Sequence, residues 1–200
     1  MKKDSKSYTV FFAFLITFVF IFVLSILNAS TAKQVNDNER LFKIKAILNA
    51  FGIDFKDDSE ALRLFSEKVE IKTVDDLELY TVSADDQKFY GIIFQGNGLW
   101  STITGFLAVD EKVERIIGLE FISQAETPGL GGRIEEKWFK DQFRSEKIID
   151  GVIKIKSGSG DFDHENGKVD AITGATQTSK SVEKIINERL DLLRNVLGVK

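Results

Sequence analysis

The chain has 200 residues and a mass of 22.5 kDa, enough for one domain and a short additional segment. Its 27 Lys and Arg against 31 Asp and Glu give a net charge of −4, which argues against nucleic acid as a partner because phosphate binding needs a basic surface. The absence of cysteine excludes disulfides, thiolate metal sites, iron–sulfur clusters and a cysteine nucleophile.

The N-terminal segment is strongly apolar. Residues 8–27 carry no charge, and at about 1.5 Å per residue a helix of this length spans the roughly 30 Å hydrocarbon core of a membrane. Lys2, Lys3 and Lys6 precede it with Asp4 as the only acid, so the positive-inside rule keeps the N-terminus in the cytoplasm. We therefore predict a cytoplasmic tail at 1–7, a single transmembrane helix at 8–28 and an extracytoplasmic domain at 29–200.

A cleavable signal peptide is the alternative interpretation of this segment. The small residues 30–32, Ser-Thr-Ala, are similar to a cleavage site. The apolar run is longer than the 7–15 residues typical of a signal peptide, which favours a retained anchor in the cytoplasmic (inner) membrane.

The remaining chain predicts one α+β domain, with an antiparallel sheet flanked by helices. Helical spacing predicts a helix near 41–51, with Gly52 as its C-cap, and a second helix capped by Asp58 or Ser59. Further along, the hydrophobic residues recur at the shorter period of a strand. This predicts an antiparallel meander with strands at 77–82, 88–94, 99–109 and 113–122 and turns at 95–98 and 110–112. A helix at 134–143, a strand at 152–156 and a last helix beginning between Thr176 and Ser179 complete the prediction.

The loop before the last helix combines small residues with hydroxyls. The free N–H groups of a first helical turn attract an anion, and small residues let it approach the backbone. A role as helix N-cap would explain any one of these hydroxyls, but four hydroxyls so close together in the sequence indicate a phosphate site. No Gly-Lys-Ser/Thr sequence follows, which argues against ATP or GTP. The residues concerned are Thr173, Gly174, Ala175, Thr176, Thr178 and Ser179.

A second loop, 125–133, is rich in glycine and also contains proline. Pro128 and the glycines at 129, 131 and 132 fix a tight conformation that exposes backbone groups, as is typical of ligand-binding loops. It does not open a strand–helix unit with an acid about 20 residues further on, so a dinucleotide fingerprint is not supported.

Together the two loops resemble a known family. Asp170-Ala-Ile-Thr-Gly-Ala-Thr176 resembles the flavinylation motif of the FMN-binding domain family, whose last Thr is esterified by the FMN phosphate. Glu126-Thr-Pro-Gly-Leu-Gly131 is similar to a signature shared by the G subunit of the Rnf electron transport complex and the C subunit of the sodium-translocating NADH:quinone reductase. Residues 96–101 and 104–109 resemble the quinone-reductase subunit more, whereas the short chain resembles the Rnf subunit more, so both remain open.

The resemblance implies a set of site residues. Thr176 would carry covalent FMN, with Thr173 in place of the commoner Ser and with Gly174 and Ala175 making room for the linkage. The flavin or its ribityl chain would lie against four residues of the other loop, Glu126, Thr127, Leu130 and Gly131. Relatives often have His-Gly where this chain has Gln124-Ala125. The implied partners are a flavin transferase and other membrane subunits.

We therefore predict a membrane-anchored electron-transfer subunit of an ion-translocating oxidoreductase complex, with the flavin supplying the redox chemistry and no catalytic acid or base in the chain. The alternative is a membrane-tethered FMN-binding sensory or ligand-binding module without electron relay. A third interpretation, a structural domain with a Thr-rich helix cap, predicts a colourless protein. No metal site is predicted, because residues 161–172 match the calcium-loop pattern at too few positions.

Overall fold

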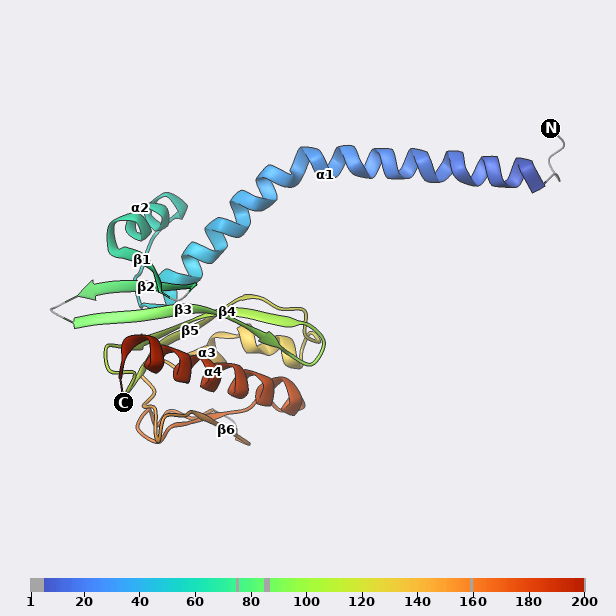
Figure 1. Ribbon diagram of the computed structural model, residues 1–200. Coiled ribbons are helices and arrows are strands. Elements are labelled where there is room, and N and C mark those ends of the chain that lie inside the picture. The colour runs from blue at the N-terminus through green and yellow to red at the C-terminus, as the bar shows by residue number, and fades with distance from the viewer. Residues whose placement is uncertain (1–5, 75, 85–86, 159, 200) are drawn as a thin grey trace. The chain divides into compact units, whose positions relative to one another are not determined.

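The computed structural model describes residues 6–74, 76–84, 87–158 and 160–199. It has two compact units, Met1–Leu41 and Phe42–Lys200. In chain order the elements are α1 (Lys6–Ala50), α2 (Asp58–Lys68), β1 (Val69–Val74), β2 (Leu77–Ala84), β3 (Gln87–Asn97), β4 (Thr102–Asp110), β5 (Ile116–Ser123), the 3-10 helix η1 (Gly131–Glu135), α3 (Lys137–Asp141), β6 (Lys154–Lys156), β7 (Lys168–Asp170) and α4 (Thr176–Leu197) (Figure 1).

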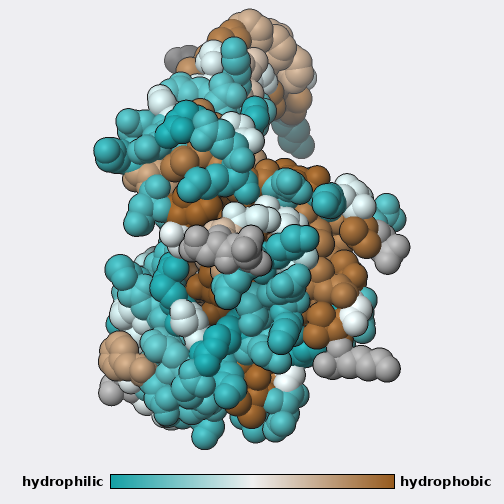
Figure 2. Space-filling view, turned by 90° about the vertical axis from the view of Figure 1, so that its left-hand side faces the viewer, coloured by the Kyte–Doolittle hydropathy of each residue, from teal (hydrophilic) through white to brown (hydrophobic). Residues whose placement is uncertain are grey.

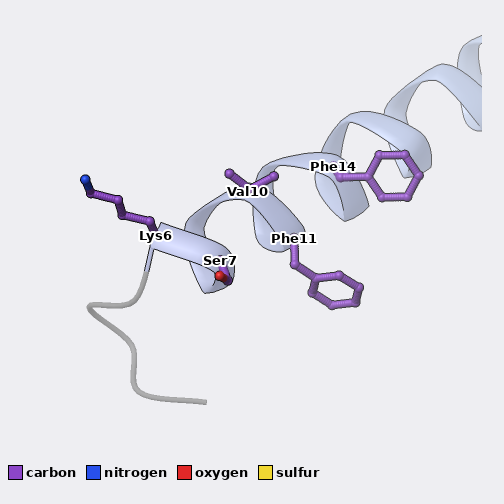
Figure 3. A pocket seen from close by; sticks show the side chains of 5 residues that line it. All are labelled: Lys6, Ser7, Val10, Phe11 and Phe14. Carbon is purple, nitrogen blue, oxygen red and sulfur yellow. The ribbon is translucent and has the colours of Figure 1, made fainter.

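The first unit contains the apolar part of α1. Its large hydrophobic side chains, from Val10 to Leu27, are exposed along the helix. Figure 3 shows Val10, Phe11 and Phe14 projecting outward from the ribbon, with Lys6 beyond them at the helix start. By length and composition α1 is able to cross a membrane. The expected apolar N-terminal helix is confirmed, while the boundaries 1–7, 8–28 and 29–200 remain predictions.

Helix α1 continues beyond its apolar part. Residues 28–40 are polar but contain neither glycine nor proline, so no residue in this segment interrupts the helix. The separate helix expected near 41–51 is therefore the last part of α1. Gly52, at φ +73°, follows this end, and its N–H donates to the Asn49 carbonyl at 3.0 Å, as expected of a glycine C-cap.

The second unit contains the predicted antiparallel meander. Strands β1 to β5 lie side by side in sequence order and pair antiparallel throughout. Strand β3 pairs with β4 from Phe89 to Asn97, so the turn expected at 95–98 lies at 98–101 instead. The sequence does not predict strand β1, because residues 70–73 are exposed and show no alternation of buried and exposed positions. This strand forms one edge of the sheet.

The two faces of the sheet bury different clusters. Along β4, Leu107 and Val109 face the cluster that includes η1, α3 and α4. The alternate residues Phe106 and Ala108 face the end of α1, where the ring of Phe51 packs edge-on at 5.3 Å from that of Phe106. Successive residues of β4 thus point to opposite faces of the sheet, and both faces are covered. Figure 1 shows the same layers, with α3 and α4 on one side of the sheet.

The segment after β5 departs furthest from the prediction. The helix expected at 134–143 is divided into the 3-10 helix η1 and the short α3, because Glu136 adopts an extended conformation between them. The strand expected at 152–156 is β6, which pairs in parallel with β7. Strand β7 lies within a polar segment for which the sequence predicts no strand, because three residues are too few to show a period.

The face of the molecule drawn in Figure 2 is largely polar. It shows mostly hydrophilic residues, with separate hydrophobic areas between them. This surface is what a domain exposed to water requires.

We predict that Gly118→Ala detaches the end of α1 from the sheet. A Cβ at Gly118 would lie 2.3 Å from the Ala50 carbonyl oxygen, a backbone atom that cannot turn aside. Overpacking of this kind costs about 1–3 kcal/mol of unfolding free energy. Chemical denaturation measures the loss. In Gly132→Ala, the new Cβ meets its nearest neighbour at 3.4 Å, so a similar loss there would contradict the steric explanation.

Candidate functional site

The first part of the site is the loop that leads from β7 into α4. Gly174 has φ +80°, a conformation that favours glycine, and Ala175 precedes the first helical residue, Thr176. The loop is closed by the Ala175 N–H, which donates to the Ile172 carbonyl at 3.0 Å. Ala175 has no side-chain oxygen to cap the helix, so the first-turn N–H groups of α4 face outward without a side-chain cap.

The four hydroxyls of this segment divide into two pairs. Thr178 and Ser179 are buried, and the Ser179 Oγ accepts from the Ile172 N–H at 3.1 Å. Thr173 and Thr176 are exposed. The four hydroxyls do not meet at one point, because a helix turns about 100° per residue and so places Thr178 about 200° around α4 from Thr176, while the Ser179 side chain turns inward to the Ile172 N–H. Thr176 is thus the accessible hydroxyl of the first turn.

A buried carboxylate joins this turn to the second loop. Glu126 is 4% exposed. Its Oε2 accepts from the Thr178 hydroxyl at 2.6 Å, and its Oε1 accepts from the N–H groups of Trp100 and Ser101 at 2.9 and 3.2 Å. One side chain therefore holds three segments: the β3–β4 loop, the glycine-rich loop and the start of α4.

These hydrogen bonds decide the charge of Glu126. Burial alone would raise the pKa of its carboxyl group. The hydrogen bonds from the Thr178 hydroxyl and from the backbone N–H groups of residues 99–101 outweigh burial and lower the pKa below its ordinary value. Glu126 is therefore an anion at neutral pH, with both oxygens occupied by protein donors.

Close backbone approach also joins the two loops. A Cβ at Gly131 would lie 2.5 Å from the Thr178 Oγ1, and one at Gly174 would lie 3.0 Å from the Leu130 Cδ2. Thr127 accepts backbone hydrogen bonds from the N–H groups of Leu130 and Gly132 and so closes the glycine-rich loop. The structure thus places Gly131 beside Thr178 and Gly174 beside Leu130, so the two loops are neighbours.

Trp100 is a residue of the site that the sequence pattern does not reveal. The sequence predicts a strand at this position, but Trp100 lies in the β3–β4 loop with 73% of its surface exposed, next to the exposed Leu99. Its backbone is fixed by Glu126, and the Ser101 hydroxyl accepts from the Ala125 N–H at 2.7 Å. Trp100 is therefore an exposed aromatic residue whose backbone position is fixed by a buried charge.

Thr173 lines a cavity of about 270 Å³. The other lining residues are Ala171, Gly158, Arg133 and Trp138, and the Arg133 guanidinium lies 5.4 Å from the centre of the Trp138 ring.

Part of the chain matches a known domain family. Residues 98–191, which contain both loops, match the model of the FMN-binding domain family. This match confirms the resemblance expected from the sequence and supports FMN as the ligand.

The chain is similar to the C subunit of Na(+)-translocating NADH-quinone reductases. It is 38% identical to that protein from Neisseria meningitidis serogroup B over an alignment of 134 residues that covers 59% of this chain and 51% of the relative. It is 33% identical to the Vibrio anguillarum protein over an alignment of 136 residues that covers 64% of this chain and 53% of the relative. The chain thus matches about half the length of these relatives.

Two solved structures share the fold. The crystal structure of the same quinone-reductase subunit from Parabacteroides distasonis has a TM-score of 0.67 and 25% identity, covering 86% of this chain and 98% of the other. The crystal structure of Shewanella oneidensis NqrC has a TM-score of 0.62 and 19% identity, covering 80% of this chain and 93% of the other. At this identity the likeness shows a shared fold only. The predicted α+β class is confirmed.

We predict that Glu126 makes stability depend on acid pH. Because its pKa is lowered in the folded state, the unfolded chain takes up the proton first as pH falls. The stabilisation by Glu126 is therefore complete above the ordinary carboxyl pKa and is lost as pH falls through the lowered one. Urea unfolding of wild type and Glu126→Gln at pH 7 and pH 3 measures this. The difference in unfolding free energy should shrink at pH 3, and an unchanged difference would contradict the assignment.

Proposed function

We propose that Thr176 carries FMN through a phosphoester and that the chain relays electrons through this flavin. The observation that carries the proposal is which hydroxyls at the start of α4 face outward and which face the interior. Within a matched FMN-binding domain, the first turn exposes the Thr176 hydroxyl and buries those of Thr178 and Ser179. A flavin transferase would bind the donor, FMN joined to a nucleotide through a pyrophosphate bond. The Thr176 oxygen attacks the FMN phosphorus, the pyrophosphate bond breaks and releases the nucleoside monophosphate, and a base of the transferase takes the hydroxyl proton.

The site suits a phosphate diester. Such a group keeps about one negative charge, and the start of α4 stabilises an anion by about 0.3–1 kcal/mol. Gly174 leaves the approach to Thr176 free of a side chain, and the Thr173 hydroxyl lies nearby on the same exposed loop. Leu130 and Trp100 offer exposed apolar surfaces for the flavin ring, with Thr127, Gly131 and Ala175 shaping the backbone around it. When bound, FMN supplies the electron transfer.

The attachment predicts a mass difference. Intact mass spectrometry of wild type co-expressed with a flavin transferase should show one added FMN minus water. Thr176→Ala should show no adduct, because the accessible hydroxyl of the first turn is gone. Thr176→Ser should regain the adduct, and Thr73→Ala, an exposed threonine on β1, should retain it. An unmodified wild type would refute the proposal.

The wider assignment concerns the complex. We favour a role in a sodium-translocating NADH:quinone reductase over one in the Rnf type, because the relatives named above belong to the former. The partners of the chain would then be the other membrane subunits of that complex. Reversible reduction of the bound flavin and co-purification with membrane subunits distinguish this relay from a sensory module.

We further propose that α1 is a retained anchor and that residues 29–200 lie outside the cytoplasm. The absence of cysteine makes this directly measurable, because an introduced cysteine is the only thiol. A membrane-impermeant maleimide should label Glu111→Cys, an exposed position, in cells with a permeabilised outer barrier. Lys6→Cys should react only after lysis. The reverse pattern would contradict the positive-inside orientation, and loss of residues 1–32 from the mature protein would show a cleaved signal peptide.

A further inference from the structure

We infer that Glu126 is a positioning residue for the flavin of Thr176 and that its buried negative charge lowers the reduction potential of that flavin. The inference rests on the proposed function, because it concerns FMN attached at Thr176. It assigns to Glu126 a role different from the direct flavin contact that the sequence resemblance implies.

The geometry points to positioning rather than contact. Both carboxylate oxygens of Glu126 are already occupied, one by the Thr178 hydroxyl and the other by the N–H groups of Trp100 and Ser101. The side chain is almost completely buried. Thr178 lies in the same helical turn as Thr176, so this one carboxylate fixes the exposed Trp100 relative to the attachment residue.

The same carboxylate places a charge close to the start of α4. Its hydrogen bonds keep it ionised, and a buried charge is screened far less than one at the surface. The start of α4 carries the positive end of the helix dipole, part of which this anion offsets. Reduction adds electrons to the flavin, so a fixed negative charge disfavours the reduced form and lowers the potential.

The first experiment measures positioning without the flavin. Hydrogen exchange of the full chain, expressed without a flavin transferase, reports the amides of Trp100 and Ser101. Glu126→Gln should speed their exchange, because a neutral amide oxygen accepts these hydrogen bonds less strongly than a carboxylate. The exposed Glu135→Gln removes a charge without touching this cluster and should leave exchange unchanged.

The second experiment measures the potential of the flavin-loaded fraction by spectroelectrochemistry. Glu126→Gln should shift the midpoint to a more positive value than wild type, and Glu135→Gln should not. Thr178→Val keeps the carboxylate charged, so its midpoint should not rise, although exchange at residues 100–101 should increase. This variant carries the test if Glu126→Gln does not fold.

The outcomes separate the two proposals. A wild type without flavin refutes the proposed function and this inference together. A loaded wild type whose potential matches that of Glu126→Gln refutes the electrostatic role alone. An equal positive shift in Thr178→Val would show that packing rather than charge sets the potential, and unchanged exchange at residues 100–101 in Glu126→Gln would refute positioning.

Discussion

The candidate site depends on the hydrogen bonds of one buried carboxylate. A buried charge is costly unless protein donors replace the water it has lost, and Glu126 has three such donors. Two of them are backbone N–H groups of the β3–β4 loop, and the third is a hydroxyl in the first turn of α4. Because losing either donor segment would leave one buried carboxylate oxygen without its protein donor, the three segments are held together as one unit.

The three joined segments are held in place by the strands and helices that flank them. The β3–β4 loop joins two strands that pair over nine positions, from Phe89–Asp110 to Asn97–Thr102. The start of α4 is fixed because residues such as Val182 and Ile186 are buried against the sheet. The opposite face of the sheet is covered by the end of α1, which approaches Gly118 at backbone contact. The loops of the site are therefore anchored to regular secondary structure.

The sequence was informative where a local pattern decides the structure. The meander followed from the strand periods, and the C-cap followed from Gly52, because both depend on neighbouring residues. The sequence was uninformative where tertiary contacts determine the structure. The hydrogen bonds of Glu126 join residues 26 and 52 positions away in the chain, so no local pattern could show which loops meet or that Trp100 is held at their junction. Strand β1 was missed for a related reason, since its exposed residues have no buried face to generate a period.

The absence of cysteine and the outward direction of Thr176 in α4 both bear on the proposed attachment of the cofactor. Without thiolates, the chain has neither iron–sulfur ligation nor a thiol of its own, so a redox role has to be carried by a bound group. An exposed domain would lose a dissociable flavin by dilution, whereas a covalent bond keeps it at a fixed local concentration. Covalent attachment needs an accessible hydroxyl, and precise placement needs buried neighbours. One helical turn meets both demands, because Thr176 and Thr178 lie on opposite sides of it.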